Sequence, residues 1–482
     1  MNRKMVFYMF GRIGQIAALL LLLPAVVALI YSEYRQLWSF LIAVAISFVI
    51  GTVISSVCRT TNKVIYAKEG FAIVSLAWLC MSAVGALPFV LSGEVPSYVD
   101  AFFETVSGFT TTGASILPDV ESMSYSMLFW RSFTHWVGGM GVLVFVMAIV
   151  SSMTDRSIHI MRAEMPGPVV GKLVPRGRDT AKILYLIYIV MTVVQIILLW
   201  AGDMNLFESI VHTFGSAGTG GFGIKSDSIG GYSSYSQIVI AVFMLLFGIN
   251  FNLYFLIIIG RFKAVLKSTE LWTYLGIAAT AVCVITFNIH SIYGSIGESL
   301  KNAFFQTSSI ITTTGYSSVD FNLWPSLSKA ILMLLMCFGS CAGSTAGGLK
   351  ISRVVILFKL ILVEIKRMLH PRAVTSVKFE DKAVDKQTLN SVAVYFAVYI
   401  LCIIATFLLV CFEPFGFESN FSAVIATFNN IGPGFGEVGP MGGFGNYTDF
   451  SKIVFSFSML LGRLEIFPLI IALSPTTWQK SR

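Results

Sequence analysis

The segment AFFETVSGFTTTG at residues 101–113 recurs at residues 303–315 as AFFQTSSIITTTG. Nine of the thirteen positions are identical, so the two segments are copies of one element. Two further copies have diverged, ESIVHTFGSAGTG at 208–220 and NFSAVIATFNNIG at 420–432. Four Thr/Gly loops of this kind in one membrane chain offer four copies of an ion-coordinating element, which indicates a pathway for a cation.

The composition places these loops in a membrane. Of the 482 residues, 56% are hydrophobic and 12% are charged, whereas soluble domains carry roughly 25% charged residues. A membrane-spanning helix needs about 20 apolar residues. The predicted spans are 13–31, 37–58, 71–91, 126–150, 183–201, 236–260, 272–290, 327–349, 353–369, 391–412 and 452–474. We expect no cleavable signal peptide, because the first apolar run is long and shows no small-residue cleavage site.

The net charge of +8 comes from clusters of Lys and Arg between the spans. These clusters lie at 3–12, 59–68, 156–182, 261–267, 350–386 and 480–482 and hold 26 of the 33 basic residues. By the positive-inside rule they are cytoplasmic, which places both termini inside. The loops at 92–125, 202–235, 290–326 and 413–451 are then external. The charge therefore reports topology rather than nucleic-acid binding, and a docking surface for a cytoplasmic partner can coexist with it.

Each Thr/Gly loop has the same setting in the sequence. An outer apolar span precedes it, followed by an amphipathic stretch too short to cross the bilayer, and a second span comes after it. The short stretches are 98–109, 205–216, 300–311 and 419–428. The pattern predicts an all-α polytopic membrane protein with four helix–P-loop–helix repeats and an N-terminal hairpin. The predicted units are the hairpin at 1–68 and repeats at 69–182, 183–268, 269–388 and 389–482, the first and third with cytoplasmic loops.

The short stretches have the length of re-entrant helices. A helix that enters from outside and ends in mid-membrane directs the negative end of its dipole to the centre, which favours a cation there. The loop that follows exposes backbone carbonyls, and rings of carbonyls replace the hydration shell of the ion in potassium filters. Aligned on their last glycine, the loops give as filter residues Thr111, Thr112 and Gly113; Gly218, Thr219 and Gly220; Thr313, Thr314 and Gly315; and Asn430, Ile431 and Gly432, with Gly434 as the alternative fourth glycine.

A glycine-rich run interrupts the second span of the third repeat. Each glycine costs a helix about 1 kcal/mol relative to alanine, so we expect two helices, 327–338 and 349–369, with a loop between them. Two interpretations stay open: small residues that let helices pack closely, or a flexible gate under the filter. The predicted gate residues are Gly339, Gly343, Ser344, Thr345, Gly347, Gly348 and Lys350, together with Arg463.

Arg463 lies in the middle of the last predicted span, where a charge is expensive and faces a cavity or a partner. A structural contact with Glu465 or with the backbone is one interpretation, although residues two apart on a helix do not face each other. A positive charge in the pore that opposes cation passage is the other. Arg131 is expected to extend its side chain to the outer interface, and His135 to pack between helices.

These residues resemble the Trk/Ktr/HKT superfamily of cation transporters, and within it the bacterial TrkH branch, over nearly the whole chain. The N-terminal hairpin is similar to the extra helix pair of TrkH-like proteins. The motifs that carry the resemblance are TTTGAS at 110–115, GTGGFG at 218–223, TTTGYSS at 312–318, NNIGPGFGEVGP at 429–440, HWVGGMGVLV at 135–144, GSCAGSTAGGLK at 339–350 and GRLEIFPL at 462–469.

The resemblance implies one subunit with pseudo-fourfold symmetry around a single pore in the bacterial inner membrane. It implies K⁺ as the transported ion, a homodimer, and a cytoplasmic nucleotide-binding regulatory ring of the TrkA type. In plant relatives a serine in place of the first-repeat glycine accompanies sodium preference, so Gly113 favours potassium. Because the four loops are not identical, we expect looser discrimination against sodium than four identical loops would give. A proton- or sodium-coupled symporter of the same fold is the alternative to a gated K⁺ pathway.

Two other classes fit the sequence less well. An intramembrane enzyme needs a nucleophile with a base, or His and carboxylate metal ligands within its spans, and the sequence has no His-Glu-x-x-His motif. We therefore expect no enzymatic activity and no cofactor bound by this chain. A carrier for an organic solute shows paired inverted halves rather than four short-loop repeats.

Overall fold

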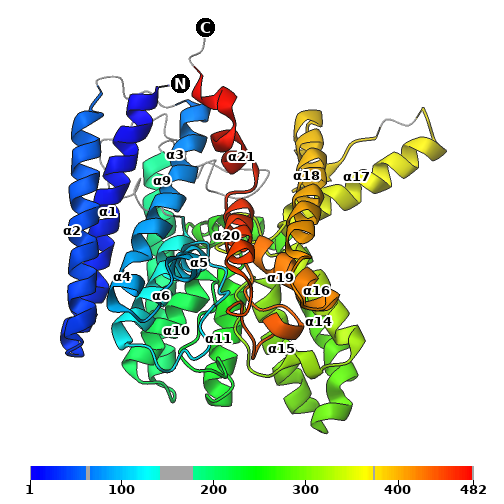
Figure 1. The fold of residues 1–482 in the computed structure, drawn as a ribbon. Helices are drawn as coiled ribbons and strands as arrows, with labels where there is room; N and C mark the ends of the chain where they lie inside the picture. Colours follow the sequence, from blue (N-terminus) through cyan, green and yellow to red (C-terminus); the bar gives the residue numbers. More distant parts are fainter. Residues whose placement is uncertain (1, 61–65, 142–176, 373–374, 381, 480–482) are drawn as a thin grey trace.

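The computed structural model describes residues 2–60, 66–141, 177–372, 375–380 and 382–479. Within these ranges, six helices are long and apolar enough to span a membrane, or up to eight if each of two bent helix pairs counts as one span. The helices α1 (Arg3–Ile30) and α2 (Tyr34–Val57) form a hairpin at one side of the molecule (Figure 1). The amino and carboxyl termini lie at the same end (Figure 1).

The rest of the chain repeats one unit of an outer helix, a short helix and an inner helix. The outer helices are α3 (Ala67–Gly85) with its continuation α4 (Leu87–Ser92), α9 (Gly177–Trp200), α14 (Thr269–Tyr293) and α18 (Lys386–Val410). The short helices are α5 (Tyr98–Phe109), α10 (Leu206–Gly218), α15 (Ile296–Ile311) and α19 (Phe417–Phe428), and they lie away from the end that carries the termini (Figure 1). The inner helices are α6 (Tyr125–Gly139), α11 (Ser234–Phe247), α16 (Ser326–Phe338) and α20 (Asp449–Arg463). The four predicted short stretches are thus confirmed as helices.

The first turn of every inner helix is held by a side chain that lies in the preceding outer helix or just after it. A hydroxyl at or near the first residue of the inner helix donates to a carboxylate or amide oxygen, which also leaves that oxygen close to the free N–H groups of the first turn. The four bonds are Ser124 to Glu94 (2.7 Å), Ser233 to Asp203 (2.6 Å), Ser328 to Asn288 (2.6 Å) and Thr448 to Glu413 (2.5 Å). The repeats therefore share their outer framework.

The inner helices of repeats 2, 3 and 4 are all broken. In the third repeat α16 ends at Phe338 and α17 (Ile351–Leu369) follows, which confirms the break predicted from the glycine run. Helix α11 is bent by 89° against α12 (Phe251–Ile258), and α20 by 119° against α21 (Phe467–Leu473).

The spans predicted at 236–260 and 452–474 are therefore each interrupted by a break, and each bent pair passes the test for a membrane span only when its two helices are taken together. At the first break, Asn250 accepts a hydrogen bond from the Asn252 backbone amide (2.9 Å) and starts a new helix. At the second, Glu465 and Ile466 both have positive φ, which interrupts the helical ladder.

The prediction of a span at 353–369 is also wrong, because α17 is too charged to count among the apolar spanning helices. The predicted span at 126–150 is followed only as far as residue 141. Its remainder, and the basic loop as far as residue 176, lie outside the described residues.

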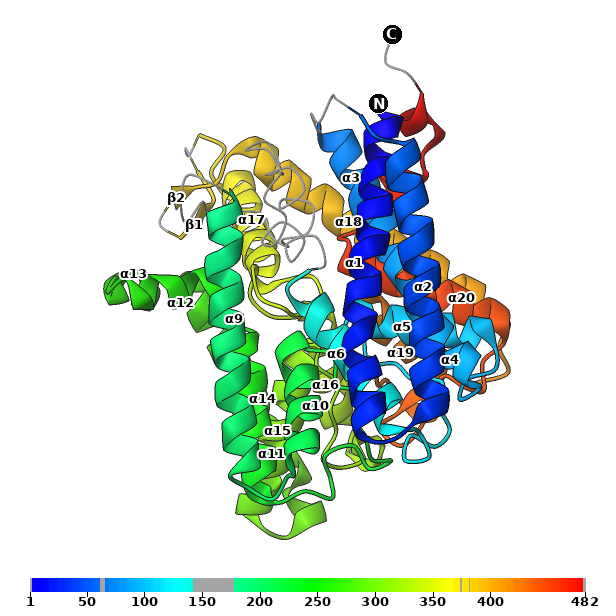
Figure 2. The same ribbon diagram turned by 90° about the vertical axis from the view of Figure 1, so that its left-hand side faces the viewer.

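The remaining elements are small and peripheral. Helices α12 and α13 (Phe262–Leu266) extend sideways from the body (Figure 2). Strands β1 (Lys378–Phe379) and β2 (Lys382–Ala383) pair antiparallel. Three single turns of 3₁₀ helix are η2 (Phe321–Leu323), η3 (Gly436–Val438) and η4 (Pro475–Trp478).

Candidate ion pathway

The four loops that follow the short helices share one backbone conformation. The first residue of each loop has a positive φ, which is uncommon for any residue other than glycine. These residues are Thr111 (53°), Thr219 (57°), Thr313 (54°) and Asn430 (56°). Two positions later a glycine again has positive φ, at Gly113 (79°), Gly221 (73°), Gly315 (87°) and Gly432 (97°). The same unusual geometry at four equivalent places indicates one repeated loop structure rather than four independent turns.

Backbone hydrogen bonds fix the register of the loops. The middle residue donates its amide to the carbonyl five residues earlier in the short helix. The pairs are Thr112 to Ser107 (2.8 Å), Gly220 to Gly215 (2.8 Å), Thr314 to Ser309 (2.8 Å) and Ile431 to Ala426 (2.9 Å). In the second repeat the set is therefore Thr219, Gly220 and Gly221, one residue later than the alignment on Gly218–Gly220 predicted. Aligning on the last glycine of the Gly-Thr-Gly run overlooked the glycine that follows it.

The loops close into a ring. A Cβ atom added to the positive-φ glycine of any loop would collide with the carbonyl oxygen of the middle residue of the next loop. The contacts run from Gly113 to Gly220, from Gly221 to Thr314, from Gly315 to Ile431 and from Gly432 back to Thr112. The order is repeat 1, 2, 3, 4 and then 1, so the four repeats surround one axis. Gly432, and not Gly434, occupies the fourth glycine position, because Gly434 lacks the positive φ and abuts Ser422.

The hydroxyls in the two Thr-Thr-Thr-Gly loops bond to each other. Thr110 and Thr112 have their Oγ1 atoms 2.8 Å apart, and Thr312 and Thr314 repeat this contact at 2.8 Å. The Asn430 side-chain amide donates a hydrogen bond to Thr112 Oγ1 (3.0 Å), which joins the fourth loop to the first. These four hydroxyls are committed to each other, whereas the buried Thr111 hydroxyl has no hydrogen-bond partner among the described residues. The oxygens that the ring can offer to a cation are therefore its backbone carbonyls and this hydroxyl.

A cavity of about 170 Å³ lies at the outer mouth of the ring. The positive-φ glycines of all four loops line it, and so does Arg131. The expectation that Arg131 extends to the interface is wrong: the residue is only 3% exposed and forms an ion pair with Glu104 at 2.6 Å. His135 packs as expected, with its ring stacked on Phe222 at a centroid distance of 4.2 Å.

The loop between α16 and α17, residues 339–350, lies directly against the ring. The Gly347 amide donates to Thr313 Oγ1 (2.7 Å), and a Cβ on Gly347 would strike the Asn429 carbonyl. The loop needs its glycines, because Gly339, Gly343 and Gly348 all have positive φ. It is thus a compact, non-helical segment that packs against the loops of repeats 3 and 4.

Other predicted gate residues hold this loop together. Ser344 donates to the Cys341 carbonyl (2.7 Å), and the Lys350 ammonium donates to the Ala346 carbonyl. Lys350 is 2% exposed and has a φ of 75°. The structure therefore brings the predicted loop residues together, and every one of them lies in or beside the same segment.

Arg463 joins three repeats beneath the ring. Its guanidinium donates to the Thr345 carbonyl of the loop (2.7 Å) and to the carbonyls of Gly138 (2.6 Å) and Gly139 (2.8 Å) at the end of α6. Of the two contacts considered for a structural role, the backbone contact is therefore present. Glu465 pairs with Arg353 of α17 at 2.5 Å. A cavity of about 40 Å³ is lined by the Arg463, Lys350 and Glu465 side chains, so it holds charges of both signs.

Sequence reasoning missed Glu270. This carboxylate at the start of α14 is 5% exposed and accepts the amides of Ala342 (2.8 Å) and Ser352 (3.1 Å). It thereby joins the first part of the 339–350 loop to the first turn of α17. An ionisable residue at the border of an apolar span is a functional candidate by default, and that signal could have identified Glu270.

Comparison with known proteins places the chain in a family. The model of the family TrkH, described as a cation transport protein, matches residues 37–480. The Trk system potassium uptake protein TrkH of Salmonella typhimurium is 37% identical over 472 residues, which are 95% of this chain and 96% of that protein. The Trk system potassium uptake protein TrkG of Escherichia coli is 34% identical over 99% of both chains.

A solved structure shows the same architecture. The crystal structure of the potassium transporter TrkH from Vibrio parahaemolyticus matches with a TM-score of 0.90 and 32% sequence identity. The match covers 99% of this chain and 100% of that chain. With its ring of four loops and its full-length relatives, the chain belongs to the TrkH family of cation transport proteins.

Proposed function

We propose that this chain carries K⁺ across the bacterial inner membrane through the ring of four loops. The observation that carries the proposal is the closed ring itself, in which four glycines at positive φ each pack against the carbonyl of the next loop. Backbone oxygens arranged around one axis can replace the hydration shell of an ion. Relatives that match over nearly their full length are named as potassium uptake proteins, which supports K⁺ as the ion.

The filter in this proposal is formed by Thr111–Gly113, Thr219–Gly221, Thr313–Gly315 and Asn430–Gly432. Gly218, the first residue of the set predicted for the second repeat, closes α10 instead. Glycine in all four loops favours K⁺ over Na⁺. The middle position differs between loops, with Thr112, Gly220, Thr314 and Ile431, so the ring is only approximately fourfold and its discrimination is expected to be moderate.

The gate in this proposal is the 339–350 loop together with Arg463. The loop lies against the ring through Gly347, and Arg463 holds it to α6. The guanidinium places a positive charge below the filter, which opposes the entry of a cation. Opening then requires that the loop and Arg463 separate, so conduction is controlled beneath the filter rather than in it.

Assembly and orientation are part of the same proposal. We place both termini in the cytoplasm, because most Lys and Arg lie in the segments on that side. The chain acts as a homodimer and is controlled by a cytoplasmic nucleotide-binding ring of the TrkA type that docks on this basic face. The basic residues along α17 offer a positive surface for such a partner.

The test is ion flux into proteoliposomes that hold the purified chain, with and without a nucleotide-binding partner. K⁺ or Rb⁺ uptake should exceed Na⁺ uptake, and Gly113→Ser and Gly315→Ser should each reduce that preference. Ion flux and K⁺ preference that persist unchanged in both variants would refute the assignment of the four loops as the filter. Flux that requires a proton or sodium gradient would replace the gated pathway with coupled symport on the same fold.

A further inference from the structure

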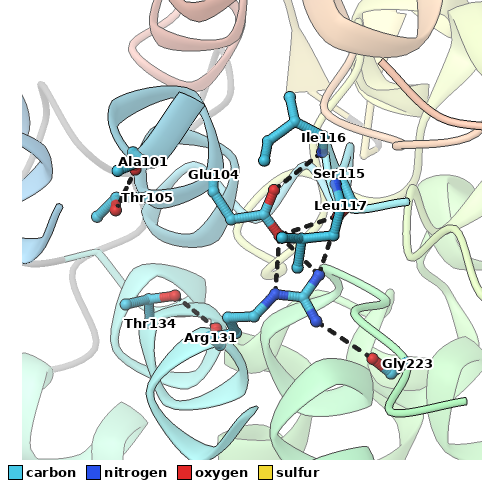
Figure 3. Close-up of polar contacts among 9 residues, drawn as sticks. All are labelled: Ala101, Glu104, Thr105, Ser115, Ile116, Leu117, Arg131, Thr134 and Gly223. Atoms are coloured by element: carbon cyan, nitrogen blue, oxygen red, sulfur yellow. Dashed lines mark hydrogen bonds and ion pairs between the residues drawn. The ribbon is translucent and has the colours of Figure 1, made fainter. Parts of the chain in front are cut away.

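A buried ion pair stands beside the first loop of the ring. Glu104 projects from the short helix α5 and Arg131 from the inner helix α6, with side chains 0% and 2% exposed. The Glu104 Oε1 atom accepts from Arg131 Nε at 2.7 Å and lies 2.6 Å from Arg131 Nη2 (Figure 3). Two full charges are thus removed from water directly behind the filter.

The pair connects two walls of the ring. On the first loop, Glu104 accepts hydrogen bonds from the Ser115 hydroxyl (3.0 Å) and the Ile116 backbone amide (3.1 Å). Both residues lie in the extended segment that follows Gly113. Arg131 donates to Ser115 Oγ (3.2 Å) and to the Gly223 carbonyl of the second loop (3.4 Å), as Figure 3 shows.

The guanidinium also lies over the ring of Phe222, 4.1 Å from its centroid. Gly223 and Phe222 directly follow Gly221 on the second loop. We call the contact between Gly113 of the first loop and Gly220 of the second loop the seam. The Glu104–Arg131 ion pair therefore binds residues on both sides of this seam.

No other repeat has this arrangement. Seven residues before the first residue of each loop stand Glu104, His212, Gln306 and Ala423. Seven residues after the N-cap of each inner helix stand Arg131, Ile240, Leu332 and Phe455. The three counterparts of Arg131 are apolar and fully buried. The fold therefore accommodates an apolar side chain at this place, and the charge in repeat 1 is not needed to fill it.

A buried ion pair is a poor way to gain stability, because the desolvation of both charges opposes their attraction. The best-documented role of buried ion pairs is to fix one arrangement of the elements that they join. We propose that Glu104 and Arg131 act as a positioning pair that sets the K⁺ over Na⁺ preference of the ring by fixing the seam between repeats 1 and 2. The inference rests on the proposed function of the ring as a K⁺ filter.

The pair acts on the ring through the freedom of its carbonyl oxygens to move. Discrimination between K⁺ and Na⁺ depends on how firmly the ring holds its carbonyls and on their field. The carbonyl of Gly220 packs against Gly113, so movement of either loop changes the spacing of the carbonyl oxygens in the ring. When the segment after Gly113 loses its hydrogen bonds to Glu104 and Arg131, the ring can contract around Na⁺, the smaller ion.

The decisive variant is the double substitution Glu104→Gln with Arg131→Leu. It gives repeat 1 the residues that repeat 3 already carries at Gln306 and Leu332, and it leaves no unpaired charge behind. We expect Rb⁺ flux within about twofold of the original chain, while the K⁺/Na⁺ permeability ratio from bi-ionic potentials falls by about threefold or more. The matched control is Lys329→Leu with Glu418→Gln, which removes an exposed pair between α16 and α19 (3.1 Å) and should leave the ratio unchanged.

Each outcome decides the question. A double variant that conducts with the original K⁺/Na⁺ ratio overturns the inference. If that variant does not fold, Ser115→Ala decides, because it removes only the hydroxyl that joins the two charged groups. Its ratio should fall in the same direction by a smaller factor, and an unchanged ratio overturns the inference equally. An original chain that does not prefer K⁺ to Na⁺ in the same vesicles refutes the proposed function instead, so the two failures are distinguishable.

Discussion

The ring of four loops and the layer beneath it come from the same four repeats but are built in opposite ways. In the ring, equivalent residues have equivalent backbone angles, and each glycine meets the carbonyl of the next loop. Beneath it, α11 bends by 89°, α20 bends by 119°, and the third inner helix opens into a loop of its own. On the proposed function, a cation held by carbonyls on several sides requires this symmetry, whereas a gate opened by one loop does not require it.

This difference indicates that ion selectivity and the control of conduction belong to separate regions of the molecule. In the proposed function, positions that recur four times with the same geometry set what the ring binds. Positions that occur once, such as Arg463 and Glu270, connect unlike elements, and the proposal assigns them the control of the pathway. Substitutions in the two regions should therefore have different signatures: loss of transport from the ring, and gain of basal transport from the layer beneath it.

The largest effect is expected for Gly221→Ala in the ring. An alanine at this left-handed φ costs about 1–2 kcal/mol, and its Cβ would also strike the Thr314 carbonyl. K⁺ flux in proteoliposomes should fall by about tenfold or more, since each 1.4 kcal/mol corresponds to tenfold in rate. The control is Gly297→Ala at the start of α15, where the new Cβ has no neighbour closer than 3.8 Å. Normal flux in Gly221→Ala would contradict the register assigned to the second loop.

The next effect is expected for Arg463→Gln beneath the ring. The substitution removes the charge and weakens the contacts with Thr345, Gly138 and Gly139, and hydrogen bonds to charged groups contribute about 1.5–3 kcal/mol each. We expect basal Rb⁺ flux to rise by about tenfold. Arg367→Gln on the exposed part of α17 is the control, because Arg367 pairs only with Glu364 of its own helix among the contacts the structure describes. Unaltered basal flux in a folded Arg463→Gln protein would argue against a gate at this place.

A smaller rise is expected for Glu270→Ala. Its carboxylate satisfies the amides of Ala342 and Ser352, and a buried amide without a partner costs about 1–3 kcal/mol. The ends of the 339–350 loop should become mobile, and basal flux should increase by roughly threefold. Glu364→Ala on α17 is the matched control. Hydrogen exchange of the loop offers a second measurement, and protection equal to that of the original chain would remove Glu270 from the gate.

The contrast between the two regions also explains what the sequence could predict. The four short helices, the break at Gly339 and the ring glycines Gly113, Gly315 and Gly432 are visible because repetition or glycine content marks them. The register of the second loop was misread, since Gly220 and Gly221 are adjacent and either can be aligned with Gly113. Only the backbone hydrogen bond from Gly220 to Gly215 decides between them.

Features that occur once were harder to predict, because no repeat reveals them. The bends after α11 and α20 follow from local backbone geometry at Asn250 and Ile466, and the hydropathy of the surrounding residues is the same as in a continuous span. The ion pair of Arg131 with Glu104 joins residues 27 apart in sequence. The only signal for it was that position 104 is one of the four differences between the two clean copies of the motif.

The smallest effect is expected at the outer framework, which is repeated like the ring but bears on stability rather than transport. Although burial raises it, hydrogen bonds from Ser233 and Ser236 lower the pKa of Asp203 to about 2. The ordinary pKa of an aspartate is 3.8, so the Asp203 carboxylate stabilises the fold above about pH 4, and this contribution is lost as the pH falls towards 2.

Asp203→Asn should therefore lower the melting temperature by no more than about 2 °C at pH 7, the size expected when an exposed cap loses part of its strength. The difference should shrink at pH 3, and K⁺ flux should stay unchanged at pH 7. Asn288, which occupies the corresponding place in the third repeat as an uncharged amide, already holds Ser328 at 2.6 Å. If Asp203→Asn altered flux without altering stability, symmetry alone could no longer separate framework from function, and the outer caps would have to be counted with the filter.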